Sequence, residues 1–332
     1  MVVQSMTKVP TTDIAGCVRQ VRRLSAAGAG LVRIAVPTGA DSAAFAKIVA
    51  KVDVPLVADI HFSATRAIEA IEAGAAKIRL NPGNIKKRED ILRIIDAAKM
   101  HRTAIRIGVN EASIRKLNGK SQDIPANQRV RFMFREMKRY VRLFESRKFS
   151  NLVLSAKSAD TVRTIEVNRA IAQAYNYPVH LGLTHAGLCE DAKITSAVAI
   201  GTLLAEGIGD TIRVSVAGDP VQEVLLGREI LRSLGLVVDN EPELIVCPTC
   251  GRCQIDVVNL ARQVKKLLKK IDKPLRVAVM GCVVNGPGEA ADADLAVCAG
   301  KGKGYIYRHG RRKMTVSEAK LLKVLAQELE KF

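Results

Sequence analysis

The chain has 332 residues, of which 48% are apolar, and this length predicts one large domain with a smaller one attached. No stretch is long and apolar enough to span a bilayer, and no basic segment precedes an apolar one at the start, so we expect a cytoplasmic protein without a membrane partner. The formal charge of +19 invites a nucleic-acid interpretation, but aromatic residues make up only 4% and basic residues are spread out, so we expect no nucleic-acid partner. A solvated basic surface, an anionic substrate and an acidic protein partner are all compatible with this charge.

Residues 1–236 alternate short β-branched segments with longer amphipathic ones. Strands are expected at residues 2–6, 31–36, 56–60, 77–80, 104–109, 151–156, 179–183 and 211–216. Helical patterns follow them near residues 13–27, 41–51, 63–73, 87–101, 128–147, 159–175, 191–206 and 220–234. This rhythm predicts an α/β fold of the (β/α)8 TIM-barrel type. A doubly wound open sheet is the alternative, but it would normally carry a glycine fingerprint after the first strand, and this chain has none there.

A second, smaller domain is expected at residues 244–332, after a linker at residues 237–243. Its predicted elements are a helix at 254–271, a strand at 275–280 and a last helix from residue 317. The glycine-rich stretch 300–304 lacks the context of a phosphate loop and is predicted to be a flexible turn. We therefore expect a TIM barrel followed by a small α+β domain.

The cysteines of the second domain predict a metal centre. Two thiols lie two residues apart in Cys247-Pro248-Thr249-Cys250, and a third follows in the glycine-rich loop at Cys282. Glu289 is the nearest candidate for a fourth ligand. A zinc site would favour a second CxxC pair or a nearby histidine, so three thiolates and a carboxylate favour an iron–sulfur cluster. A CxxC in a buried turn and a redox disulfide are the alternatives that this motif leaves open.

Arginines stand inside several apolar strands of the predicted barrel. They are Arg33, Arg79, Arg106 and Arg213. Because residues two apart share a face of a strand, these pairs are expected on matching faces: Arg79 with Asn81, Arg106 with Asn110, Arg213 with Ser215, and Asp59 with His61. Lys157 follows the sixth strand, and Thr184-His185 follows the seventh.

These buried cations need a partner. One arginine in a strand is usually part of a structural ion pair, but Asp59 is the obvious carboxylate at this level and cannot neutralise all four. A polyanionic ligand held by bidentate contacts, such as a diphosphate, would satisfy them. His61 and His185 are candidates for acid–base chemistry or for hydrogen-bonding roles, whereas His101 and His180 are expected only in the latter.

Six segments spread over the chain carry a more specific pattern. They are Val3-Gln4-Ser5-Met6-Thr7, Val57-Ala58-Asp59-Ile60-His61-Phe62, Asn81-Pro82-Gly83-Asn84, Ile107-Gly108-Val109-Asn110, Glu206-Gly207-Ile208-Gly209-Asp210-Thr211-Ile212-Arg213-Val214-Ser215 and Met280-Gly281-Cys282-Val283-Val284-Asn285-Gly286-Pro287-Gly288-Glu289-Ala290. Together they resemble the bacterial 4-hydroxy-3-methylbut-2-enyl diphosphate synthase family of the non-mevalonate isoprenoid pathway, over essentially the whole chain.

The resemblance implies an oxidoreductase with a 4Fe-4S cluster held by Cys247, Cys250, Cys282 and Glu289. It implies that 2-C-methyl-D-erythritol 2,4-cyclodiphosphate undergoes two-electron reductive ring opening, in which Glu289 gives way to the substrate and reduced flavodoxin or ferredoxin supplies electrons. It implies a homodimer in which the cluster domain of one subunit caps the barrel of the other. The implied substrate-binding residues are Arg33, Asp59, His61, Arg79, Asn81, Arg106, Asn110, Lys157, Thr184, Arg213 and Ser215.

The chain departs from the family pattern in three places. His185 stands where the family typically has the glutamate of Thr-Glu-Ala-Gly, so we expect the histidine either to move protons or to mark an altered enzyme. The family usually has sequence before the first strand, and Cys253 adds a thiol near the CxxC. Two competing functions are a non-catalytic metal-binding module with a basic RNA-binding surface and a barrel lyase or aldolase that uses Lys157 as a Schiff-base amine.

Overall fold

The computed structural model describes residues 1–85, 87–114, 124–184, 187–237 and 241–332. The chain divides into two compact units, Met1–Val237 and Val238–Phe332. Each unit has its own apolar core, so each is described by itself. None of the helices in these described ranges has the length and apolar character needed to cross a bilayer.

The first unit is built from parallel strands, each followed by a helix. The strands are β1 Val2–Met6, β2 Leu31–Ala35, β3 Leu56–Ile60, β4 Lys77–Leu80, β5 Ala104–Asn110, β6 Leu152–Lys157, β7 His180–Leu181 and β8 Thr211–Ile212. The helices are α1 Ile14–Ala26, α2 Gly39–Val49, α3 Ala64–Glu72, α4 Arg88–Met100, α5 Ala126–Glu145, α6 Thr161–Ala174, α7 Cys189–Ala205 and α8 Val221–Ser233. Short 3-10 turns at Pro82–Asn84 and Glu111–Ser113 follow β4 and β5.

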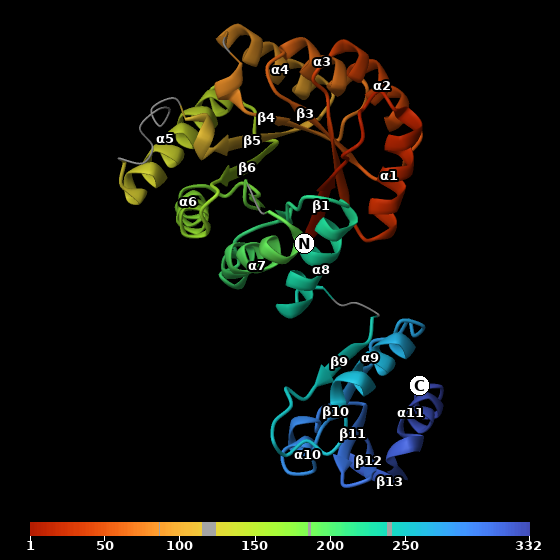
Figure 1. Ribbon diagram of the computed structural model, residues 1–332. Helices are drawn as coiled ribbons and strands as arrows, with labels where there is room; N and C mark the ends of the chain where they lie inside the picture. The colour runs from red at the N-terminus through yellow and green to blue at the C-terminus, as the bar shows by residue number, and fades with distance from the viewer. Residues whose placement is uncertain (86, 115–123, 185–186, 238–240) are drawn as a thin grey trace. The chain divides into compact units, whose positions relative to one another are not determined.

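The eight strands run in the order β6-β5-β4-β3-β2-β1-β8-β7. An isolated parallel bridge between Leu154 and Val179 brings β6 next to β7 and closes the sheet on itself. Figure 1 shows the helices of this unit outside the strands. The predicted (β/α)8 TIM barrel is therefore confirmed.

Side-chain alternation divides each barrel strand between two environments. In β2, Val32 and Ile34 belong to the apolar core between strands and helices, whereas Arg33 lies on the opposite face. Four of these helices, α1, α2, α3 and α6, begin at a side-chain cap, such as the capping box of Thr38 and Asp41 at α2. β7 and β8 are shorter than expected and end at Leu181 and Ile212. The apolar face thus holds the barrel together and leaves the inner face for polar residues.

The second unit contains one mixed sheet and two longer helices. Its elements are β9 Glu243–Val246, α9 Val257–Leu268, β10 Arg276–Met280, α10 Gly286–Glu289, β11 Leu295–Gly300, β12 Lys303–Arg308, β13 Arg311–Ser317 and α11 Leu321–Leu329. The five strands run in the order β13-β12-β11-β10-β9, with β9 to β11 parallel and β12 and β13 antiparallel. Apolar residues of α9 and α11 share a core with the sheet, which confirms the α+β class.

Two expectations for this unit were only partly right. The glycine-rich stretch predicted to be a flexible turn belongs to a β-hairpin, in which Gly300 pairs with Lys303 and Gly302 has a φ of +67°. The last helix begins at Leu321, after a 3-10 turn at Glu318–Lys320, and residue 317 ends β13. Local glycine content marked the bend correctly but did not reveal the strands on either side of it.

Candidate functional site

Charged residues of three neighbouring strands lie side by side in the barrel. In the strand register, Asp59 of β3 pairs with Arg79 of β4, and Arg79 pairs with Arg106 of β5. Figure 1 shows the position of these strands within the ring of helices. The strand register therefore brings two of the four predicted strand arginines, Arg79 and Arg106, to the level of Asp59.

Asp59 is the carboxylate at the centre of this group. Its Oδ2 lies 3.7 Å from Arg33 Nε and 3.8 Å from His61 Nε2, and its Oδ1 lies 3.4 Å from Arg79 Nη1. Burial raises the pKa of this carboxyl, but the charges of Arg33 and Arg79 outweigh that effect and hold the pKa below its usual value. Asp59 is therefore ionised and compensates part of the positive charge.

Glu223 is a second buried carboxylate, which the sequence analysis missed. It lies in the first turn of α8, is fully buried, and accepts hydrogen bonds from Arg213 Nε and Nη2 at 3.0 and 2.9 Å. Ser5 Oγ also donates to it at 2.9 Å, and Lys8 Nζ lies 3.5 Å away. In the sequence, Glu223 was only an acidic residue in the helix after the eighth strand. Because of its two hydrogen bonds, Arg213 is already paired, whereas we expected an unpaired cation there.

Arg106 has no such partner. It is 1% exposed, and its Nε and Nη1 donate no hydrogen bond to any described residue. Gln4 of β1, which is fully buried, likewise has no partner for its side-chain amide. Burial lowers the pKa of Arg106, and neighbouring arginines lower it further. A buried guanidinium with free donors favours binding of an anionic ligand.

Lys157 and His180 lie together on the inner face of β6 and β7. Lys157 Nζ is 3.4 Å from His180 Nε2, and both residues are buried. Lys77 of β4 is a further buried cation, and burial next to Arg106 lowers its pKa to about 8. The barrel interior thus contains more basic side chains than the carboxylates Asp59 and Glu223 can pair with.

The remaining predicted barrel residues lie near the same ends of the strands. Asn81 is buried after β4 and accepts a hydrogen bond from the Gly83 backbone, and Asn110 is the register partner of Lys157. The Thr184 backbone donates to the Ser158 carbonyl at 3.1 Å, and Ser215 is half-buried after β8. His185 lies outside the described residues.

The cysteine motifs meet around one small pocket of the second unit. A cavity of about 130 Å³ is lined by Cys247, Pro248, Thr249, Cys250, Arg252, Met280, Gly281, Cys282, Asn285, Gly286 and Glu289. Cys247 follows β9, Cys282 follows β10, and Glu289 ends α10, so the parallel strand ends bring the motifs together. The Cys247 backbone donates to the Val279 carbonyl at 3.0 Å, which ties the first motif to β10.

The donor chemistry of this pocket fits a metal or cluster that prefers thiolates. The backbone N–H groups of Asn285 and Val284 lower the pKa of the Cys282 thiol, which favours the ligating form. Gly286 is required there, since a Cβ would come 2.9 Å from Met280 Cβ. Within the described part of the chain, however, no three His, Cys, Asp or Glu residues converge closely enough to hold a single metal ion. The predicted ligands line the pocket but do not form a preassembled metal site.

The two additional cysteines of this unit differ from the predicted ligands. Cys298 of β11 is fully buried, and burial together with Cys282 raises the pKa of its thiol to about 12. Cys253 lies against Gly281, where a Cβ would clash with its sulfur. Neither lines the pocket.

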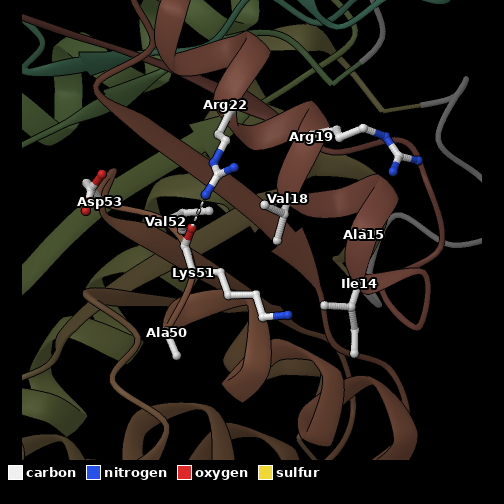
Figure 2. Close-up of a pocket in the computed structure, with 9 residues that line it drawn as sticks. All are labelled: Ile14, Ala15, Val18, Arg19, Arg22, Ala50, Lys51, Val52 and Asp53. Atoms are coloured by element: carbon white, nitrogen blue, oxygen red, sulfur yellow. Dashed lines mark hydrogen bonds between the residues drawn. The ribbon is translucent and has the colours of Figure 1, made fainter.

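A larger hollow lies on the outer surface of the barrel. Its volume is about 780 Å³, and Figure 2 shows it between α1 and residues 50–53. The Arg22 guanidinium donates to the Lys51 carbonyl at 3.1 Å there. None of the predicted site residues lines this hollow, so we do not place the chemistry there.

Comparison with known proteins gives consistent matches to both units. A family model described as the GcpE TIM-barrel domain matches residues 1–228, and one described as the GcpE protein C-terminal domain matches residues 243–331. The 4-hydroxy-3-methylbut-2-en-1-yl diphosphate synthase (flavodoxin) of Caldanaerobacter subterraneus subsp. tengcongensis is 46% identical, over 100% of this chain and 92% of that protein. The protein of the same name from Clostridium perfringens is 45% identical, over 99% of this chain and 93% of its own length.

Among solved structures, a dihydropteroate synthase from Coxiella burnetii has a TM-score of 0.50 at 11% identity, over 70% of this chain and 94% of that chain. At this identity the likeness shows a shared fold and nothing about activity.

Proposed function

The chain belongs to the GcpE family, and from this membership we propose that it forms 4-hydroxy-3-methylbut-2-en-1-yl diphosphate in isoprenoid biosynthesis. Its proposed substrate is 2-C-methyl-D-erythritol 2,4-cyclodiphosphate, which an oxidoreductase would open and dehydroxylate with two electrons. The relatives support this enzyme and not an RNA-binding metal module.

The observation that carries the substrate proposal is the uncompensated positive charge inside the barrel. Arg106 is buried, with Nε and Nη1 unpaired among the described residues, and Lys157 is buried with no carboxylate of those residues in ion-pair distance. A diphosphate brings the charge and the acceptor oxygens that these groups need. We propose that it is bound by Arg33, Arg79, Arg106, Lys157, Arg213 and Ser215, with Asp59, His61, Asn81, Asn110 and Thr184 around it.

Members of the family depend on a metal, and we propose that this chain holds a 4Fe-4S cluster through Cys247, Cys250, Cys282 and Glu289. When bound, such a cluster supplies electrons one at a time. The thiolate-stabilising N–H groups at Cys282 support this assignment. Glu289 is the single carboxylate among three thiolates and is therefore the ligand that is easiest to displace.

The proposed roles of the protein side chains are to bind, to exclude water and to move a proton. The barrel cations fix the diphosphate, so that the reacting carbon lies at a defined place. His185 would donate the proton with which a substrate hydroxyl leaves as water. We further propose a flavodoxin as electron donor, in line with the relatives' names, and a cytoplasmic homodimer whose subunits complete each other's sites.

The test is anaerobic turnover of the cyclic diphosphate by cluster-reconstituted protein with a strong artificial reductant, from about pH 5.5 to 9. We expect the linear hydroxymethylbutenyl diphosphate as product. Protein that has not been reconstituted is the matched control and should give none. Protein with an intact cluster that forms no product at any pH would overturn the proposal. If the pH dependence of turnover were the same in His185→Gln as in wild type, His185 would have no role in proton transfer.

A further inference from the structure

Lys157 and His180 form a contact whose role the proposed reaction does not explain. Their side chains meet at 3.4 Å between Nζ and Nε2, and His180 is fully buried. No carboxylate of the described residues lies within ion-pair distance of either side chain, since Asp59 pairs with Arg33 and Arg79 and Glu223 pairs with Arg213. An amine and an imidazole thus share a site that has no counter-ion.

His180 is held by two contacts of its ring and one of its backbone. Its Nδ1 lies 2.8 Å from Thr211 Oγ1 on β8, and its own backbone carbonyl accepts a hydrogen bond from Ser155 Oγ at 2.9 Å. An ammonium group has no acceptor, so Nε2 must accept from Lys157 whenever the lysine is charged. Nδ1 then carries the hydrogen and donates to Thr211, which makes His180 neutral in that state.

The amine is fixed as well. A Cβ at Gly182 would come 2.7 Å from Lys157 Nζ, so the absence of a side chain at this position creates the space that the amine occupies. Lys157 ends β6, where its register partner is Asn110 of β5. The contact with His180 therefore follows from the strand geometry and from Gly182, and not from a mobile surface side chain.

The surroundings disfavour positive charge on both groups. Burial lowers the pKa of Lys157 well below its ordinary value, and the charges of Arg106, Arg33, Arg213 and Arg79 lower it further. Burial likewise lowers the pKa of His180, helped by Arg106, Lys157, Lys77 and Arg33. Arginine keeps its proton in proteins, so lysine and histidine are the groups here that respond by losing one.

We propose that binding of a polyanionic substrate in the barrel takes up one proton, which is held between Lys157 Nζ and His180 Nε2, with His180 as the positioning residue for the amine. The proton comes from solvent and forms an N–H bond on the amine, and no electron is transferred. The negative charge of a diphosphate opposes the burial and the arginine charges that lower the two pKa values, and it therefore favours the protonated form of the pair. The inference rests on the proposed function only for the class of ligand.

The test is calorimetric titration of the full-length protein with inorganic pyrophosphate in two buffers of different ionisation enthalpy, which counts the protons bound with the ligand. Protonation of pyrophosphate itself contributes equally to all variants, so the variants are compared with one another. Lys157→Arg carries a fixed charge, and we expect the wild-type protein to take up as much as about one proton more than this variant near pH 7.5.

His180→Gln can still accept a hydrogen bond from the amine but cannot titrate. We expect the pH of maximal proton uptake to shift by about one unit in this variant, while the conservative replacement retains pyrophosphate binding. His180→Asn serves if the glutamine variant does not fold. His101→Gln, at the exposed C-terminal end of α4, is the matched control and should behave as wild type.

Equal uptake by wild type and Lys157→Arg would overturn the proposal, as would a lack of pyrophosphate binding in the wild type. An unchanged pH profile in His180→Gln would refute the role of His180. Proton-linked binding without turnover would count against the proposed function alone, whereas product formation without linked protons would count against this inference alone.

Discussion

Arg79 and Arg106 are register partners on neighbouring strands, yet only Arg79 reaches a carboxylate. Arg79 Nη1 lies 3.4 Å from Asp59 Oδ1, whereas Nε and Nη1 of Arg106 have no hydrogen-bond partner among the described residues. These two arginines lie at one level of the barrel, but they contribute differently to the free energy of folding. One completes an ion pair, and the other leaves its donors free for a ligand.

Replacing Arg106 by methionine is predicted to stabilise the fold and to weaken ligand binding. Removal of a buried, uncompensated charge should raise the free energy of unfolding by about 1–3 kcal/mol. Chemical denaturation measures this change, and calorimetry with pyrophosphate should show binding weakened by a factor of about 30 or more. A destabilised Arg106→Met protein would mean that the guanidinium has a structural partner.

Arg213→Met is predicted to have the opposite effect on stability. Glu223 is fully buried and accepts two hydrogen bonds from Arg213, so removing the arginine leaves an unpaired carboxylate. We expect a loss of about 3–5 kcal/mol in the free energy of unfolding. The double variant Arg213→Met/Glu223→Gln should recover part of that loss, and additive effects of the two single changes would exclude the coupling.

Lys77 is predicted to make stability increase at alkaline pH. Its pKa falls from 10.5 to about 8 on folding, through burial and the nearby charge of Arg106. Between these values the unfolded state binds more protons than the folded state, so the free energy of unfolding rises with pH, by about 3 kcal/mol in full. The comparison is denaturation of wild type and Lys77→Met at about pH 8 and pH 10. If the free energy of unfolding changed equally between the two pH values in wild type and in Lys77→Met, this prediction would be contradicted.

Cys282→Ser is predicted to lose most of the bound iron after anaerobic reconstitution. Its thiolate is favoured by the backbone N–H groups of Asn285 and Val284, and a hydroxyl is a poor substitute as an iron ligand. Cys253→Ala is the matched control, because Cys253 does not line the pocket and should leave the iron and sulfide content unchanged. If both variants lost iron equally, the assigned ligand set would be wrong.

The barrel was largely predictable because its two strand faces differ so clearly. Apolar β-branched residues mark the outward face, and the strand bounds were predicted to within a few residues, apart from the shorter β7 and β8. In the second unit β9, β11, β12 and β13 were missed. β11 is a run of small buried residues, and β13 is a mostly exposed basic segment, so neither shows the alternation typical of a half-buried strand.

The site was predictable only where a residue type is rare in its setting. Arginines in apolar strands and a CxxC with a distant third thiol stand out in the sequence. Glu223 did not, because an acid in the first turn of a helix is ordinary, and its burial depends on the closure of the barrel. His180 was expected only as a hydrogen-bonding residue, and its contact with Lys157 depends on Gly182.

The junction of β6 and β7 is joined by a single bridge between Leu154 and Val179, in contrast to the six register partners that link β5 to β6. Because so few hydrogen bonds join these two strands, we expect local opening of the barrel to start at this junction. Lys157 and His180 flank that seam. A ligand that protonates the contact between Lys157 and His180 would therefore also strengthen the junction of β6 and β7. Amide hydrogen exchange at residues 152–157 and 179–181 should then slow when pyrophosphate binds.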